Sequence, residues 1–353
     1  MTPGWLIVLA AALLPWSTKL PLVTSDPGRA YVTTPLVLWL AILLGALALW
    51  ISQRDLWLGA FAGWGVLGFL LHPALRQFET VEAIVLGSAA LCWVREVDQA
   101  WHPRLKALLI WSAGLQVGWL WMQSLGVDWT WAGWGPFTEA PRPHGTFGNA
   151  KYLAAYLAMI IPMTGVAGSL WLLTGLIGTL SVLGLLAAGL GWAWQCRRPW
   201  RWMLGLVAVM PGVLLLHHGG WNAVLASGQT RWEYWSVGLR DLHPHEWVLG
   251  AGPGMWMEHA ATLPIGRVPA LEGFPIWMHS DVLQVLYEGG LVAVLIAGAW
   301  LWTQQAMWRG PWRGSAAAVG LLSLAFMPFH LITTGVVALV VLGCATTKEE
   351  TRC

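Results

Sequence analysis

Apolar runs broken by short polar segments recur along almost the whole chain. Because a helix needs roughly 20 apolar residues to cross a bilayer, these runs predict helices near 4–20, 33–51, 55–71, 80–94, 105–125, 200–216 and 282–302. Two further apolar stretches cover 152–194 and 315–345. The second contains Met327-Pro328-Phe329-His330, which predicts a broken helix or hairpin because proline cannot continue a helix. The pattern predicts an all-α fold.

Composition places these helices in a membrane. Of the 353 residues, 57% are hydrophobic and only 10% are charged, whereas an ordinary soluble domain has roughly 25% charged residues. Trp supplies 29 aromatic residues, against 5 Tyr and 8 Phe, and Trp favours the boundary between membrane and water. We therefore expect a polytopic membrane protein in contact with membrane lipids. The net charge of +2 includes no run of like charges, which argues against nucleic acid as a partner.

The basic residues of the short loops predict the orientation, because such residues favour the cytoplasmic side. A cytoplasmic N-terminus places all of these clusters inside: Arg54; Arg95, Arg104 and Lys106; Arg197, Arg198 and Arg201; Arg309 and Arg313; Lys348 and Arg352. The polar segments 126–149 and 217–281 then lie outside. This arrangement needs three short helices in 150–194 and about 12 crossings in all, while two long helices are the alternative.

The chain accordingly divides into N-terminal helices, residues 1–125, a second helical region, 126–345, which includes the outer loop 217–281, and a cytoplasmic tail, 346–353. No cleavable signal peptide is expected, because the first apolar run lacks a basic region before it. Both termini are expected in the cytoplasm.

The outer loop 217–281 has the highest density of polar side chains. Within it, residues 230–242 predict an amphipathic helix at the membrane surface, because apolar residues recur at spacings of three and four: Trp232, Trp235, Leu239 and Leu242. This helix would place Arg231 and Arg240 near lipid headgroups. Headgroup contact and a role in catalysis both fit their spacing.

His279-Ser280-Asp281 precedes the helix expected near 282–302. Asp281 followed three residues later by Gln284 resembles a capping box, which predicts Asp281 as the N-cap. His279 would then precede a helix N-terminus, where the helix dipole favours a neutral imidazole that can act as a base. Asp281, Gln284 and Glu288 share one face, and such a polar stripe must face the bundle interior or a wet cavity.

A second polar signal is Gly145-Thr146-Phe147-Gly148-Asn149, in which the glycines allow a tight turn and Asn149 can cap the next helix. Tyr152 and Tyr156 share a face of that helix. His217-His218 and His243-x-His245 offer possible zinc ligands, but their spacing does not select the four that a closed site needs. We expect neither a metal site nor a cofactor.

These segments together resemble the bacterial O-antigen ligase and O-antigen polymerase superfamily of polytopic membrane glycosyltransferases. The resemblance spans roughly residues 145–345, and its four features occur in order: the Gly145–Asn149 turn with Tyr152-Leu153-Ala154-Ala155-Tyr156; Arg231 to Trp235 ahead of Gly250-Ala251-Gly252-Pro253-Gly254; His279-Ser280-Asp281 with Gln284 and Glu288-Gly289-Gly290-Leu291; and Pro328-Phe329-His330.

The resemblance implies a membrane glycosyltransferase fold of the GT-C-like type in the bacterial inner membrane, with a periplasmic active site. The donor would be a glycan on undecaprenyl diphosphate, and the acceptor a hydroxyl of lipid A–core, of a protein or of another glycan. Catalysis would need no metal. By motif position, His279 would assist transfer and Arg231 would hold the diphosphate.

The expected substrate-binding set is completed by Arg240, Lys151, Asn149, Tyr152, Asp281 and Gln284. Several positions depart from the family pattern: Ser181-Val182-Leu183-Gly184 lacks an Arg that members often carry, Lys151 replaces a small or amide residue, and Ser280 stands where Asn is common. We hypothesise that Lys151 compensates for the missing Arg. Protein O-oligosaccharyltransferase, O-antigen polymerase, transporter and noncatalytic membrane subunit are alternative functions.

Overall fold

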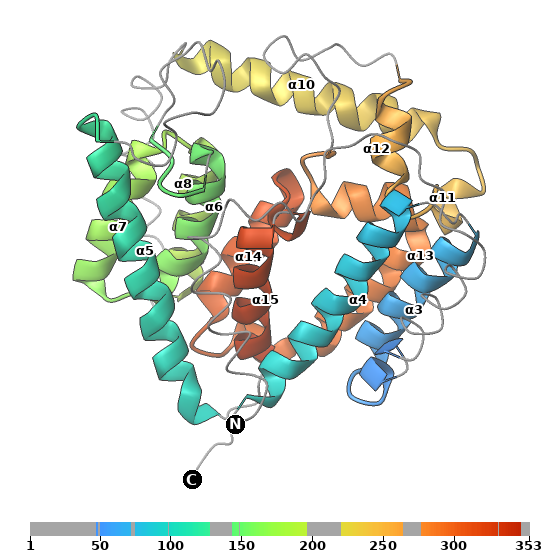
Figure 1. Cartoon of the computed structure of the whole chain (residues 1–353), viewed down its shortest axis with the longest axis horizontal. Helices are drawn as coiled ribbons and strands as arrows, with labels where there is room; N and C mark the ends of the chain where they lie inside the picture. Colours follow the sequence, from blue (N-terminus) through green and yellow to red (C-terminus); the bar gives the residue numbers. More distant parts are fainter. Residues whose placement is uncertain are drawn as a thin grey trace.

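A computed structural model of the chain describes residues 47–71, 75–127, 143–195, 220–263 and 277–346, apart from the single residues 49, 98, 148 and 331. This described part is all-helical and contains no β-strand (Figure 1). Its helices are α3 (Leu56–Leu71), α4 (Leu75–Glu96), α5 (His102–Ser124), α6 (Ala150–Ile160), α7 (Val166–Gly178), α8 (Val182–Gln195), α10 (Gly220–Asp241), α11 (Glu246–Leu249), α12 (Met255–Ala260), α13 (Asp281–Thr303), α14 (Arg313–Ala325) and α15 (Ile332–Thr346). The all-α prediction is confirmed.

The helices predicted near 55–71, 105–125 and 282–302 are confirmed within a few residues as α3, α5 and α13. The apolar stretch 152–194 divides into α6, α7 and α8, which confirms three short helices over two long ones. Pro162 lies in a 3-10 turn, Ile161–Met163, that ends α6, since proline lacks the N–H that the helix would need.

The remaining helix predictions have mixed outcomes. The amphipathic helix predicted over 230–242 begins ten residues earlier, as α10. The final apolar stretch is broken as predicted, by the 3-10 turn Pro328–His330 between α14 and α15. The helices predicted near 4–20 and 200–216, and most of the one near 33–51, lie outside the described residues.

The longer helices form a bundle, and α10 runs across one end of it (Figure 1). In this view α5 and α7 lie on one side of the bundle, α3 and α4 lie on the other, and α14 and α15 lie between them. Small residues bring α8 and α14 together: a Cβ on Gly191 would lie 2.6 Å from the carbonyl oxygen of Gly314. Small residues at helix contacts are typical of bundles that pack in lipid.

Helix α13 is interrupted at Gly290, whose backbone angles are φ 67° and ψ −174°. A break of this kind leaves carbonyl groups without their helical partners. The segment after α11 supplies new ones, because the amides of Ala251 and Gly252 donate to the carbonyls of Tyr287 and Glu288 at 2.8 and 3.0 Å. The glycine-rich segment 250–254 therefore supplies hydrogen-bond donors to carbonyl groups at the break in α13.

By length and composition, α13 is the one helix of the described part that is long and apolar enough to cross a membrane. The shorter apolar helices of this part are Leu56–Gly68, Ala150–Met163, Ala167–Gly178, Val182–Gln195, Arg313–Ala325 and Thr334–Thr346. The count of about 12 crossings stays a prediction.

Candidate functional site

Helix α10 holds the segment that leads into α13. The indole Nε1 of Trp235 donates to the carbonyl of Met278 at 2.6 Å, and the Tyr234 ring stacks on His279 with 6.3 Å between ring centroids. Gly238 leaves room for Trp256, because a Cβ there would lie 2.5 Å from the indole. The predicted apolar face is buried only in part: Leu242 is 7% exposed, but Trp232 is 68% exposed, and the buried Tyr234, 2% exposed, lies outside that face. The buried face of α10 therefore covers His279.

His279 is held in an unusual conformation with one ring nitrogen unpaired. Its φ of 57° lies in the left-handed region, which non-glycine residues rarely adopt. Its Nδ1 is buried and has no hydrogen-bond partner among the described residues. Burial, together with the positive charges of Arg231 and Lys151, lowers the pKa of His279 to about 4. The imidazole is therefore neutral at pH 7, and burial is the largest cause of the lowered pKa.

The predicted capping box at Asp281 is wrong. Ser280 is the N-cap of α13, since its backbone is extended and its Oγ accepts from the amide of Leu283 at 3.2 Å. Asp281 is the first helical residue. Gln284 does not bond back to the amide of Asp281, as a capping box would require; its Oε1 accepts from the amide of Met278 at 3.2 Å. The prediction failed because serine, one residue earlier, can make the same capping bond.

Asp281 instead binds the turn between α14 and α15. Its Oδ1 lies 2.6 Å from Nδ1 of His330, and its Oδ2 accepts from the amide of Phe329 at 3.4 Å. The backbone is joined as well, because the amide of Asp281 donates to the carbonyl of Phe326 at 3.1 Å. Three contacts thus tie the start of α13 to residues 326–330.

His330 is the functional candidate that the sequence did not single out beyond its place in a motif. Its side chain is 17% exposed, and the Trp277 ring packs on it with 4.7 Å between centroids. Burial lowers the pKa of His330, but the hydrogen bond and negative charge of Asp281, with the charge of Glu288, more than offset this and raise it. The available signal was a histidine beside a proline-induced helix break.

The polar stripe on α13 faces the bundle interior, as predicted. Asp281, Gln284 and Glu288 are 5%, 2% and 7% exposed. Nε2 of Gln284 donates to the Glu288 carboxylate at 2.9 Å, so the stripe is joined to itself as well as to the neighbouring segments. Each of these polar groups has a protein partner, as buried polar groups require.

Arg231 joins α10 to the end of α14. Its Nη1 donates to the carbonyl of Ala325 at 2.9 Å, which places a cation at a helix C-terminus, where the dipole favours it. Burial lowers the pKa of Arg231, but an arginine stays protonated in proteins. A guanidinium has five N–H donors, so one carbonyl leaves most of them for a ligand.

Arg240 is exposed and does not share this position. It lies nine residues after Arg231, which is about 180° around the helix and about 13 Å along it. The structure therefore does not bring the two arginines together.

The turn at residues 145–149 is held by two glutamines of α5. Oε1 of Gln123 accepts from the amides of His144 and Gly145, both at 2.9 Å, and Oε1 of Gln116 accepts from the amide of Thr146 at 3.0 Å. Gly145 has φ 62°, which glycine adopts without strain. Sequence reasoning missed both glutamines because each lies inside an otherwise apolar helix.

Asn149 is the N-cap of α6, as predicted, and its Oδ1 accepts from the amide of Lys151 at 2.8 Å. Lys151 is exposed, and its positive charge contributes to the lowered pKa of His279. Tyr152 is half-buried and packs on Phe326 with 6.0 Å between ring centroids. The start of α6 thus lies beside the same turn that Asp281 and Arg231 bind.

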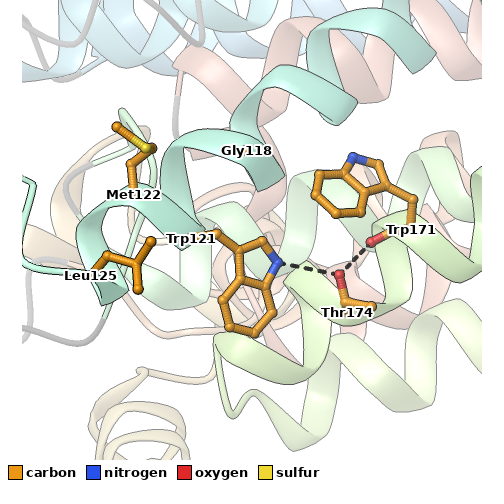
Figure 2. Close-up of a pocket in the computed structure, with 6 residues that line it drawn as sticks. All are labelled: Gly118, Trp121, Met122, Leu125, Trp171 and Thr174. Carbon is orange, nitrogen blue, oxygen red and sulfur yellow. Dashed lines mark hydrogen bonds between the residues drawn. The ribbon is translucent and has the colours of Figure 1, made fainter.

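A surface groove of about 370 Å³ lies apart from these residues, between α5 and α7 (Figure 2). Trp121 and Trp171 line it, with Gly118, Met122, Leu125 and Thr174. Nε1 of Trp121 donates to the Thr174 hydroxyl at 3.3 Å. The groove has no charged side chain, so it lacks the groups that would bind a diphosphate.

Metal ligands do not gather in the described part of the chain, where no group of three His, Cys, Asp or Glu side chains could hold an ion. His243 and His245 stack on each other, with 5.9 Å between ring centroids, and both are exposed. His217 and His218 lie outside the described residues.

A comparison with models of known protein families finds no match, and neither does a comparison with curated proteins. Of the predicted residues, the structure gathers His279, Arg231, Lys151, Tyr152, Asp281 and Gln284 around the entry to α13 and the turn after α14, with Asn149 capping the adjacent helix; Arg240 is left outside.

Proposed function

We propose that this chain is a polytopic membrane glycosyltransferase of the O-antigen ligase type. It would move a glycan from undecaprenyl diphosphate to a hydroxyl of lipid A–core on the periplasmic face of the bacterial inner membrane. One observation carries the proposal. His279 is neutral, its buried Nδ1 has no hydrogen-bond partner among the described residues, and the positive charges of Arg231 and Lys151 act on it.

Two cations beside His279 suit a diphosphate leaving group. Negative charge grows on the diphosphate as the sugar departs, and guanidinium groups bind phosphate oxygens with two parallel hydrogen bonds. Arg231 is fixed by Ala325, so its remaining donors are positioned in advance. Lys151 adds a second positive charge from the start of α6.

His279 would hydrogen-bond the reacting groups. A neutral imidazole offers one donor nitrogen and one acceptor nitrogen. Its Nδ1 is buried and has no protein partner in the described part of the chain, so a hydrogen bond from a bound substrate would satisfy it.

The amphipathic helix α10 supports a site at the membrane surface. Its exposed face carries Trp232 and Leu225, whose side chains are 68% and 46% exposed and suit the boundary of lipid and water. α13, although interrupted at Gly290, has the length and composition to cross a bilayer. We propose that it is one of about 12 membrane helices.

Transport is the alternative from another class, and the polar stripe supports transfer over transport. A stripe that lined a transport pathway would present polar groups to water. Asp281, Gln284 and Glu288 are instead buried and bound to protein groups, which favours a supporting role beside a reaction site.

The test is a deletion strain of the source organism, complemented with the wild-type chain or with His279→Gln at matched membrane expression. We expect the wild type to restore glycan on lipid A–core and the variant to leave undecaprenyl-linked glycan accumulating. His245→Ala is the matched control, because His245 is exposed and stacks only on His243 among the described residues.

The acceptor is read in the same strains. Loss of glycan from a protein would indicate a protein O-oligosaccharyltransferase, and loss of long chains alone would indicate a polymerase. A deletion that changes no glycan would overturn the proposal.

A further inference from the structure

His279 is poorly suited to act as the general base of the transfer reaction. A general base works best when its pKa lies near the working pH. The pKa of His279 is about 4, because burial and two neighbouring cations oppose its charged form. Some other group must receive the proton that an acceptor hydroxyl loses on transfer.

The pair of Asp281 and His330 has the geometry of an oriented base. Oδ1 of Asp281 lies 2.6 Å from Nδ1 of His330, and a carboxylate at that nitrogen holds the proton there. The basic lone pair is then on Nε2. This atom has no hydrogen-bond partner among the described residues, and the side chain is 17% exposed.

The pair also lies beside the residues already assigned to the site. Asp281 and Trp277, which both contact His330, flank His279 in sequence. On the other side, the turn that carries His330 follows Ala325, whose carbonyl binds Arg231. The two imidazoles therefore border the same end of α13.

A purely structural role would be redundant here. The backbone bond from Asp281 to Phe326 already joins α13 to this turn, and the hydroxyl of Thr334 donates to the carbonyl of Pro328 at 2.8 Å within it. Burying an ion pair is costly and often adds no stability.

We propose that His330, oriented by Asp281, is the general base that takes the proton of the acceptor hydroxyl, in place of His279. This inference rests on the proposed transfer reaction. As the acceptor oxygen bonds the anomeric carbon, the bond from that carbon to the diphosphate oxygen breaks. The diphosphate leaves with the electron pair, and the hydroxyl proton passes to Nε2 of His330. His279 then donates a hydrogen bond to the departing diphosphate beside Arg231.

The experiment measures kcat/KM for transfer between pH 5 and 9 with the purified full chain in detergent. Undecaprenyl-linked glycan extracted from the deletion strain is the donor, and lipid A–core from that strain is the acceptor. The base must be neutral, so wild-type activity should rise with pH through the pKa of the base. The titratable groups whose charges act on His330 are Asp281 and Glu288, both on α13.

We expect His330→Gln to lose about 100-fold or more in kcat/KM and to lose the rise with pH. Asp281→Asn should lower the plateau and move the rise to lower pH, because it removes the charge that raises the pKa of His330. His279→Gln should lower kcat/KM but keep its increase with pH. Thr334→Val is the matched control: it loses a hydrogen bond to the same turn but should keep the wild-type profile.

A rise with pH that persists in His330→Gln and vanishes in His279→Gln would overturn the assignment. Thermal unfolding of each variant reports folding. Should His330→Gln fail to fold, Asp281→Asn decides, because an unmoved rise excludes the pair. Absence of transfer by the wild type at every pH would refute the proposed function itself, which is a distinct result.

Discussion

Two buried aspartates lie at opposite ends of α13, and their partners differ. Asp55 is the residue before α3, and its Oδ1 accepts from the amides of Trp57 and Leu58. Its Oδ2 is bound by Nη1 of Arg95 at 2.5 Å and by the indole of Trp300, near the C-terminal end of α13, at 3.2 Å. Asp281, at the N-terminal end, is bound by His330 and by the amide of Phe329.

The difference separates a structural carboxylate from one that is available for chemistry. All the partners of Asp55 keep their protons at neutral pH: two amides, an indole and an arginine. The main partner of Asp281 is an imidazole, which changes charge near neutral pH and has a second nitrogen to offer. A buried carboxylate with fixed donors stabilises a fold, whereas one with a titratable partner can also steer a proton.

Removing Asp55 should have the largest effect on stability. Asp55→Ala leaves the part-buried Arg95 without its partner and α3 without its N-cap, so we expect a loss of about 3–5 kcal/mol. Thermal unfolding of the purified protein measures it. The control is Arg54→Ala, because the Arg54–Glu96 pair is 35% and 53% exposed and should contribute less than about 1 kcal/mol. Equal losses in the two variants would erase the distinction between a buried and a surface pair.

At the N-terminal end of α13, substitutions should lower the rate of glycan transfer. Arg231→Ala should slow transfer by about ten- to a hundredfold, because one charge-assisted contact to the diphosphate contributes roughly 1.5–3 kcal/mol. Arg231→Lys keeps the charge but not the paired donors, so its rate should be intermediate. The rate of undecaprenyl diphosphate release gives the measurement. A rate for Arg231→Ala within twofold of the wild type would remove this arginine from the site.

The helices were predictable because each depends on a local pattern. Apolar runs located α3, α5 and α13, and Pro162 and Pro328 marked real breaks. The break in α13 was not predicted, although Gly289-Gly290 marks its place. It depends on the amides of the segment after α11, about 40 residues earlier in the chain, and a local pattern contains no such contact.

The candidate site was predictable only in part, for the same reason. His279 and Arg231 were found by motif, and Asn149 by its capping position. His330 gains its character from Asp281, 49 residues away, and the turn before α6 depends on Gln116 and Gln123 inside an apolar helix. Periodicity places a residue on a face of its helix, but it does not identify the residue opposite.

The two histidines should give pH dependences of opposite sign. The pKa of His279 falls from 6.5 to about 4 on folding, so the unfolded chain binds a proton first and stability falls as pH drops through this range. The pKa of His330 is raised above 6.5, so its contribution is present below pH 6.5 and is lost as pH rises through the folded value.

Thermal unfolding as a function of pH measures both effects. His279→Gln should flatten the loss on the acid side, and His330→Gln should flatten the loss above pH 6.5. If both variants change stability on the same side of the pH profile, the pKa shifts that distinguish the histidines would be wrong.

The smallest expected effect concerns the two exposed cations, Lys151 and Arg240. Lys151 lies near enough to act on His279, but an exposed charge contributes at most about 1 kcal/mol, so Lys151→Ala should slow transfer by about two- to fivefold. Arg240 lies on the other side of α10 from Arg231, so Arg240→Ala should leave the rate unchanged. Raising the salt concentration should shrink the Lys151 effect, because salt screens exposed charges. A larger loss in Arg240→Ala than in Lys151→Ala would mean that the diphosphate binds on the exposed face of α10, away from His279 and from the end of α13 that Asp281 organises.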